Sequence, residues 1–333
     1  MLQKNKKRTL LRKALLLKYL LFQSPEELFV FFLLKINEKR ILRKIYKKII
    51  LRPLPGKGYL IFIGEWMGNL GNNLIQLSNA LNIAIETKSK LFLPKHDIIK
   101  STNFDFTDPE NNNCNKEIKG IFYYSFQCFV YSLDGKDAER RKIYQEYVLP
   151  LLPQVEIDEV GPETLVLNIR SGTDIFCADP PPSPQYVQPP LSYYKHIIDN
   201  GNYKDILIVT NKDRKNPCVE KLLSWNKNIR IMESSPIRDM SAVLKARYLV
   251  IGVTTFSIQL ALMSQNLKKL YQPHFIKLYS QPQIINGVRD YSIYNYKFNN
   301  YINPGEWKCT KEQLKMMINH HIQDVEFLHK TVN

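Results

Sequence analysis

The chain has 333 residues, of which 44% are hydrophobic and 11% aromatic, so its length and composition favour two packed domains and exclude a disordered protein. The formal net charge of +16 is uneven, because residues 1–52 carry 15 Lys/Arg against 3 Asp/Glu and residues 53–333 carry 32 against 28. The nearly balanced body excludes a general nucleic-acid-binding surface, so we expect no nucleic acid among the partners.

The basic segment at the amino end, residues 1–55, is predicted to be helical and amphipathic. Residues 9–22 are basic and leucine-rich, and the stretch SPEE at 24–27 gives a capping box for a second helix. No apolar run reaches the roughly 20 residues that a membrane span needs. Two interpretations stay open: residues 1–52 bind an anionic membrane surface, or the helices pack on the body with solvated lysines. The stretch PLPGKG at 53–58 marks the boundary to the body.

The first half of the body, residues 56–158, begins with a pattern typical of a βαβ unit, which implies a parallel sheet. Residues 100–120 are polar and rich in asparagine, and we expect a long loop there. The aromatic stretch at 121–131 fits a strand or a buried helix equally well. The expected elements are a strand at 59–64, a helix at 72–88 and a strand at 90–94.

The second half, residues 159–309, alternates apolar strand patterns with helical ones, and residues 310–333 are predicted to form a terminal helix. The fold class that follows is α/β, with two doubly wound domains facing a cleft. The expected strands lie at 164–169, 205–210, 229–233, 248–253 and 268–273, and the expected helices at 191–200, 217–226, 237–246 and 255–266.

The stretch LVLNIRSGTDIF at 165–176 places an arginine at the carboxyl end of a predicted buried strand. Doubly wound sheets bind ligands at this edge, and the guanidinium of Arg170 matches phosphate oxygens. Gly172 would let the backbone approach a ligand closely. The alternative is a structural ion pair between Arg170 and Asp174.

Two further strand-to-helix junctions carry polar residues. In VTTFS, 253–257, Thr254 or Thr255 is a good N-cap, and the free N–H groups of a helix start favour an anion; both roles can hold together. In GNLGNN, 68–73, glycines allow a tight turn and asparagines offer amide groups to the cleft.

Several chemistries find no support in the sequence. It has no nucleophile elbow, no kinase motif set, no HExxH and no D-x-D pair of metal-chelating acids, so we expect no metal and no cofactor. The five cysteines are far apart and lack zinc spacing, which indicates reduced thiols and a cytoplasmic location, peripheral on the membrane if the basic segment binds lipid.

Four segments in order resemble the α-1,2-fucosyltransferase-like proteins, over roughly residues 59–275. GNLGNNLIQLSNALNIAIETKSKLFLP resembles the family's G-x-L-G-N-Q-x-x-Q stretch with its helix and K-L-x-L-P, and LNIRSGTDIF resembles H-I-R-x-G-D. YVQPPLSYY is similar to QPPLxYY, and the region from Asp239 to Ser264 is similar to the late family segment that ends in S-T-F-x-x-x-x-A.

The resemblance implies a GT-B fold, GDP-fucose as donor, no metal and transfer with inversion. It implies that Arg170 holds the donor diphosphate and acts in catalysis with Asp174. With the strand-end pattern, it gives a candidate donor site of Arg170, Gly172, Asp239, Thr254, Thr255, Phe256 and Ser257. The candidate acceptor side of the cleft consists of Asn69, Gly71, Asn72 and Asn73.

The sequence also departs from the family pattern. Asn168 stands where the family has histidine, and Asn73 where it has glutamine. Either Thr173 is an insertion that displaces the family acid to Asp174, or Thr173 replaces that acid, which leaves a base at Asp174 uncertain. Asp239 is either part of the donor site or simply a helix-start residue.

The function that these patterns favour is an inverting fucosyltransferase acting on a glycan or lipid-linked saccharide. Two alternatives stay open, because nothing in the sequence selects the base or the sugar. One is the same fold with another nucleotide sugar, and the other is a non-catalytic, membrane-associated glycan-binding or scaffold protein.

Overall fold

The computed structural model describes residues 58–333, except 110–115, 154, 226–227, 276–284 and 332–333. The predicted basic helices of residues 1–55 therefore lie outside the described residues. Within the described part, no helix is both long and apolar enough to cross a membrane.

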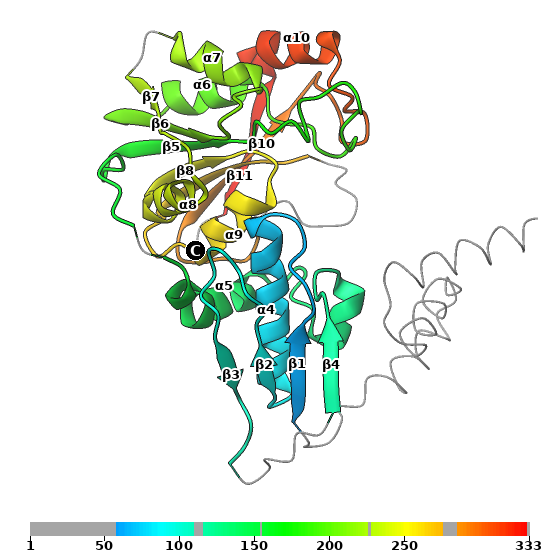
Figure 1. The fold of residues 1–333 in the computed structure, drawn as a ribbon. Helices are drawn as coiled ribbons and strands as arrows, with labels where there is room; N and C mark the ends of the chain where they lie inside the picture. Colours follow the sequence, from blue (N-terminus) through cyan, green and yellow to red (C-terminus); the bar gives the residue numbers. More distant parts are fainter. Residues whose placement is uncertain (1–57, 110–115, 154, 226–227, 276–284, 332–333) are drawn as a thin grey trace, which may run out of the picture. The chain divides into compact units, whose positions relative to one another are not determined.

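The amino-terminal sheet confirms the predicted βαβ unit. Its strand order is β3-β2-β1-β4, in which β1 pairs in parallel with both β2 and β4, and β3 is antiparallel to β2. The helix α4 connects β1 to β2 and covers the sheet (Figure 1). The elements are β1 (Tyr59–Ile63), α4 (Leu70–Glu86), β2 (Lys90–Phe92), β3 (Asn103–Asp105) and β4 (Lys116–Gly120).

The long loop predicted at 100–120 is wrong in part, because it contains β3 and β4. Both strands are short, polar and mostly exposed at the two edges of the sheet, so they lack the apolar run that signals a buried strand. The ambiguous stretch at 121–131 contains a 3₁₀ helix, η1 (Ser125–Tyr131). After it come α5 (Asp137–Ile143), the π-helical turn η2 (Tyr144–Val148) and η3 (Leu149–Leu151).

The carboxy-terminal sheet has the order β11-β10-β9-β8-β5-β6-β7, and all neighbours are parallel except the β10–β11 pair. From β7 to β10 this is the doubly wound strand order of a Rossmann-type sheet: β6 and β7 are added on one side of β5, and β8, β9 and β10 on the other, so the strand order reverses between β5 and β8. The strands are β5 (Thr164–Ile169), β6 (Asp205–Thr210), β7 (Ile229–Ile231), β8 (Tyr248–Ile251), β9 (Lys269–Pro273), β10 (Ser292–Phe298) and β11 (Val325–Thr331).

Helices cover both faces of this sheet (Figure 1). On one face lie α6 (Leu191–Asp199), α7 (Pro217–Leu223) and α10 (Lys311–Asn319), and on the other α8 (Pro236–Lys245) and α9 (Thr255–Met263). Together with the smaller parallel sheet, this confirms the predicted α/β class with two parallel-sheet halves.

The terminal helix predicted at 310–333 is wrong beyond Asn319. The helix α10 ends there, and after a short turn, η4 (Ile322–Asp324), the chain returns as β11 and pairs antiparallel with β10. The β-branched and aromatic residues Val325 and Phe327 favour a strand over a helix, and the pairing covers the edge of β10.

The buried apolar residues form two clusters, one of which joins the two halves. The strand β5 is fully buried between the two clusters. Its residue Val166 packs in the first cluster, and Leu165 and Leu167 pack in the second. The first cluster continues through α8, α9 and α4 into the amino-terminal sheet, so both sheets pack on shared helices. Residues from Lys57 onward form one compact unit. Each fully buried leucine in this core contributes roughly 2 kcal/mol.

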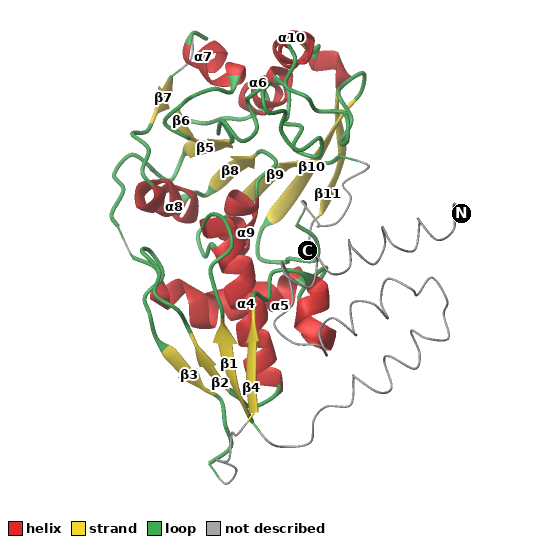
Figure 2. Cartoon of the chain, turned by 45° about the vertical axis from the view of Figure 1, so that its right-hand side comes forward, coloured by secondary structure: helices red, strands yellow, loops and turns green. Residues whose placement is uncertain are grey.

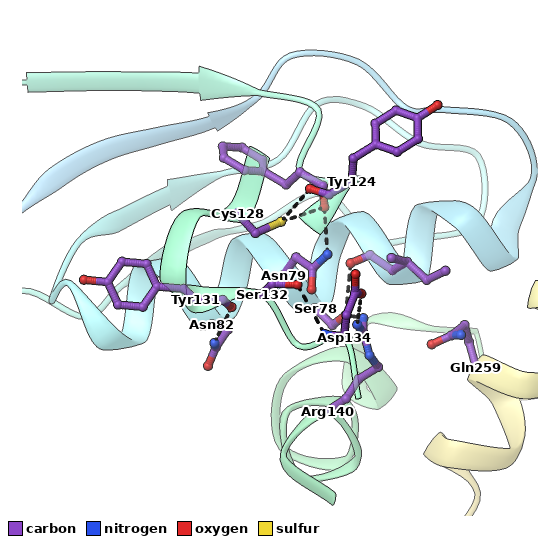
Figure 3. A network of polar contacts seen from close by, with 12 residues as sticks. Ser78, Asn79, Asn82, Tyr124, Cys128, Tyr131, Ser132, Asp134, Arg140 and Gln259 are labelled. Atoms are coloured by element: carbon purple, nitrogen blue, oxygen red, sulfur yellow. Dashed lines mark hydrogen bonds and ion pairs between the residues drawn. The ribbon is translucent and has the colours of Figure 1, made fainter. Parts of the chain in front are cut away.

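Polar contacts reinforce the same helices (Figure 3). Asn79 of α4 donates to the backbone oxygen of Phe122 at 2.9 Å, and Arg140 of α5 donates to Ser78 Oγ of α4 at 2.6 Å. The hydroxyl of Tyr144 donates to Gln259 Oε1 of α9 at 2.6 Å, within the buried region between α4, α5 and α9. These buried hydrogen bonds cross element boundaries, which fixes how the helices sit against one another.

Candidate functional site

A cavity of about 500 Å³ lies where the carboxyl ends of β5, β6 and β8 meet the amino-terminal end of α4. This is the switch point of the doubly wound sheet, the position at which such sheets bind ligands. From the carboxy-terminal half it is lined by Asn168, Ile169, Arg170, Asp174, Ile175, Tyr186, Thr210, Asn211, Pro236, Asp239 and Val253 to Phe256, and from the other half by Gly68 to Asn73 and His96 to Ile98.

Arg170 lines this cavity and is also ion-paired. Its Nη2 lies 2.5 Å from Asp174 Oδ2, and its Nη1 donates to Asn211 Oδ1 at 3.2 Å. The arginine side chain is 19% exposed and the aspartate side chain 57%. The structural pair considered as an alternative is therefore present, and both of its members face the cavity. One oxygen of the Asp174 carboxylate is thus used to hold the guanidinium of Arg170.

The loop after β5 is fastened to the loop after β6. Asn211 Oδ1 also accepts from the backbone N–H of Ser171 at 3.1 Å, and Asn216 Nδ2 donates to the backbone oxygen of Arg170 at 3.0 Å. Ser171 Oγ accepts from the backbone N–H of Asn216 at 2.7 Å. Sequence reasoning did not select Asn211. The signal for it was its position directly after the predicted strand 205–210, beside the carboxyl end that carries Arg170.

Gly172 does not line the cavity, and its role differs from the predicted close approach to a ligand. A β-carbon at this position would lie 2.2 Å from Asp174 Oδ1 and 3.1 Å from both terminal nitrogens of Arg170. Because Gly172 has no side chain, the side chains of Arg170 and Asp174 can meet above the loop that connects them.

The start of α9 and the start of α4 meet at the cavity. Thr254 caps α9, because its Oγ1 accepts from the backbone N–H of Phe256 at 3.2 Å. Thr255 Oγ1 donates to Asn72 Oδ1 of α4 at 2.9 Å. A β-carbon on Gly71 would lie 2.5 Å from the backbone nitrogen of Phe256, so only glycine permits this approach. Gly71 lies within the first turn of α4, not in the turn before it. The glycine in the tight turn before the helix is Gly68, at φ +66°.

The remaining predicted residues differ in placement. Asn69 is the N-cap residue of α4 but makes no capping hydrogen bond with its side chain, so its amide is not used by the helix. Asn73 is buried and donates to the backbone oxygen of Met67 at 3.1 Å, which makes it a bracing residue of the turn. Ser257 is fully buried, and the structure brings it near the cavity only through its neighbour Phe256.

Asp239 lies in the first turn of α8 and lines the cavity. Its Oδ2 accepts from the hydroxyl of Ser234 at 2.8 Å, whereas its buried Oδ1 has no hydrogen-bond partner among the residues that the structure describes. Burial raises the pKa of this carboxyl from 3.8 to about 6, against the opposing effect of Ser234. Both predicted roles, helix-start residue and site residue, are compatible with this position.

Sequence reasoning missed His96 and Asp97, which line the cavity from the amino-terminal half. They follow the short strand β2 and have no motif around them. His96 Nδ1 accepts from the backbone N–H groups of Ile98 and Ile99 at 2.9 and 3.0 Å, and His96 Nε2 lies 3.1 Å from Asn73 Oδ1. The histidine thus ties the turn after β2 to the first turn of α4.

No group of three or more His, Cys, Asp or Glu side chains that could hold a metal ion occurs among the residues placed by the structure. Metal independence of the site remains a prediction.

Comparisons with known proteins give a loose structural likeness. No family model and no curated protein matches the sequence, so the resemblance to α-1,2-fucosyltransferase-like proteins stays a prediction. Among solved structures, POFUT1 in complex with GDP overlaps 63% of this chain and 95% of its own, at 11% identity and a TM-score of 0.35. POFUT1 in complex with GDP-fucose overlaps 65% and 98%, at 11% identity and a TM-score of 0.36. Similarity at this level is too low to assign an activity.

Proposed function

We propose that this protein is an inverting glycosyltransferase that transfers fucose from GDP-fucose to a glycan or lipid-linked saccharide. The observation that carries the proposal is that the Arg170 guanidinium and the amino-terminal end of α9 line the same cavity. A guanidinium and free helix N–H groups are the groups that bind and neutralise a diphosphate.

In the proposed reaction, the bond between the anomeric carbon and the diphosphate oxygen breaks and its electron pair stays on the leaving diphosphate. The acceptor oxygen forms the new bond from the opposite face. Charge therefore grows on the diphosphate in the transition state, where Arg170 and the N–H groups at the start of α9 stabilise it. Asn211 and Asp174 hold the guanidinium in place for this role.

The choice of GDP-fucose rests on the sequence motifs around Arg170 and Thr255. The cavity supplies a carboxylate, Asp239, with one oxygen unused by the described residues, which suits the hydrogen-bond donors of a nucleotide. The proposed transfer needs no metal, because side-chain and backbone donors neutralise the diphosphate.

The test is release of labelled sugar from GDP-fucose, GDP-mannose, UDP-glucose and UDP-N-acetylglucosamine, each with and without EDTA. We expect release from GDP-fucose alone, unchanged by EDTA and lowered about 100-fold or more in Arg170→Ala. Arg247→Ala is the matched control, since Arg247 is exposed and does not line the cavity. Release from a UDP-sugar alone would show that GDP-fucose is not the donor. Release from none of the four would refute the proposed glycosyltransferase activity.

The Arg170–Asp174 pair favours a second candidate, a non-catalytic protein that binds a nucleotide or glycan in the same cavity. In such a protein the guanidinium is already satisfied by a carboxylate and has no leaving group to neutralise. Binding of GDP without any release of sugar would support this candidate.

A further inference from the structure

Three aspartates line the cavity, and their surroundings differ. Asp174 is balanced by Arg170, and Asp239 accepts a hydrogen bond from Ser234 on the carboxy-terminal half. Asp97 lies on the amino-terminal half, is exposed, and makes no hydrogen bond or ion pair with any residue that the structure describes. Of the three, Asp97 is therefore the one whose two oxygens are both unengaged by the described residues. Asp239 keeps one oxygen unengaged, but it lies on α8 of the carboxy-terminal half, the side proposed to hold the diphosphate.

The turn that carries Asp97 is held by its neighbour. The backbone N–H groups of Ile98 and Ile99 both donate to His96 Nδ1, which therefore carries no proton. The ring proton is then on Nε2 and is donated to Asn73 Oδ1 at 3.1 Å. The rings of His96 and Trp66 also pack in a T-shaped arrangement, with 5.1 Å between their centroids. Since both nitrogens are engaged, His96 is not a base itself; it fixes the position of Asp97 relative to α4.

Inversion requires that the acceptor attack from the side opposite the leaving group. The groups proposed to hold the leaving diphosphate, Arg170 and the start of α9, belong to the carboxy-terminal half. Asp97 belongs to the wall of the same cavity that the amino-terminal half contributes, with the turn after β2 and the start of α4. A carboxylate on that wall is placed to take the proton of an incoming hydroxyl.

We infer that Asp97 is the general base of the proposed transfer and that His96 is its positioning residue. This inference rests on the proposed function. As the acceptor oxygen bonds to the anomeric carbon, its proton moves to the Asp97 carboxylate, and the electron pair of the breaking bond leaves with the diphosphate. The neutral carboxyl then returns the proton to water, so no other reactant is needed.

The test uses the full chain, labelled GDP-fucose as donor, and water or azide as acceptor. Water must lose a proton when it attacks, whereas azide is already an anion. In Asp97→Ala we expect hydrolysis to fall about 100-fold or more, and azide to restore turnover and give fucosyl azide of inverted configuration. Asp158→Ala is the matched control, because Asp158 is also exposed and does not line the cavity.

Three results separate the inference from the proposed function. If Asp97→Ala and Asp97→Asn both bind GDP normally and hydrolyse GDP-fucose within threefold of the wild-type rate, Asp97 is not the base and the function stands. Slow hydrolysis that azide does not rescue, in variants with wild-type GDP affinity and melting temperature, also overturns it. If the wild-type chain turns over no GDP-fucose, the proposed function and the inference fall together.

A second measurement reports on His96 directly. Burial lowers the pKa of His96, and the charge of Asp97 opposes that effect. The Asp97→Asn variant should therefore lower the pKa of His96 further, as measured by NMR titration of its ring protons. The variant His96→Gln should slow turnover while leaving the affinity for GDP within twofold of wild type.

Discussion

At the scale of single residues, the site depends on how Arg170 is held. The pair with Asp174 is more than half exposed on the carboxylate side, so it contributes only about 0–1 kcal/mol to stability. Its effect is on orientation, because Asp174 and Asn211 together fix two of the terminal nitrogens. Gly172 makes this possible by leaving the space into which the pair folds.

Asp239 is a residue whose placement opposes stability. Its unfolded pKa of 3.8 rises to about 6 on folding, so between these values the folded chain holds a proton that the unfolded chain releases. The free energy of unfolding therefore falls as the pH rises from about 4 to about 6. Such a cost at a cavity is typical of residues kept for binding.

The variant Asp239→Asn removes that titration. We expect it to be more stable than wild type at pH 7, by on the order of 1 kcal/mol after allowance for partial exposure, and equally stable at pH 4. Urea denaturation at both pH values measures this, with Asp213→Asn as an exposed control. The account of Asp239 is contradicted if the difference between wild type and variant is the same at both pH values.

At the scale of elements, the site is made by two helix starts that nearly touch. Figure 2 shows α4 and α9 next to each other between the two sheets. The partial positive charge of the α9 start favours an anion in the cavity beside this contact. The close approach depends on Gly71, because any side chain there meets the backbone of Phe256.

Replacement of Gly71 by alanine should separate the two helix starts. We expect a loss of about 1–3 kcal/mol in the free energy of unfolding and at least a tenfold weaker affinity for GDP. Thermal denaturation and calorimetry measure the two effects. Gly161→Ala is the control, since its β-carbon meets only Thr164 Oγ1 at 3.4 Å. An alanine variant that binds GDP as tightly as wild type would show that the helix contact is irrelevant to the site.

The elements that could be predicted from the sequence are those whose strands are buried on both faces. The strands β5, β6 and β8 are continuous apolar runs, and each is followed by a helical pattern. The edge strands β3 and β4 were missed because polar, exposed residues give no such signal. The sequence predicts residues 310–333 as one helix because the helical pattern of α10 at its start is strong. The apolar and polar alternation of β11 that follows is short and reads as a continuation of that helix.

The candidate site could be predicted only where a parallel strand fixes position. Arg170 and Thr254 each follow a buried parallel strand, so their proximity follows from the rule that carboxyl ends share an edge. Asp97 and His96 follow the three-residue strand β2, and nothing local separates them from a solvated loop. Their place in the cavity that Arg170 also lines arises from packing between the two halves, which a single sequence does not encode as a local pattern.

At the scale of the whole molecule, the two halves are joined away from the cavity as well as beside it. Arg141 of α5 is buried and donates to the backbone oxygens of Leu262 and Ser264, at 2.6 and 2.7 Å, just where α9 ends. Charge-assisted bonds to the end of a helix also suit its dipole. The cavity walls are therefore held by an apolar core and by buried polar contacts on the same set of helices.

We expect the basic segment, residues 1–52, to bring this protein to an anionic membrane surface. Co-sedimentation with vesicles containing 30% phosphatidylserine should pellet the full chain but not a chain that begins at Pro53. Binding should weaken in 0.5 M salt, because the lysine and arginine contacts are screened. Vesicles of neutral lipid are the control, and equal pelleting of the two chains would refute the anchor.

The most direct measurement of the central claim is calorimetric titration of the wild-type chain and of Arg170→Ala with GDP, UDP, ADP and CDP, without added metal. The wild-type chain should bind GDP more tightly than the other nucleotides, and Arg170→Ala should lose most of that affinity, whereas Arg247→Ala should keep it. If no nucleoside diphosphate binds, or if Arg170→Ala binds GDP as tightly as wild type, the assignment of Arg170 to the diphosphate of a nucleotide sugar is wrong.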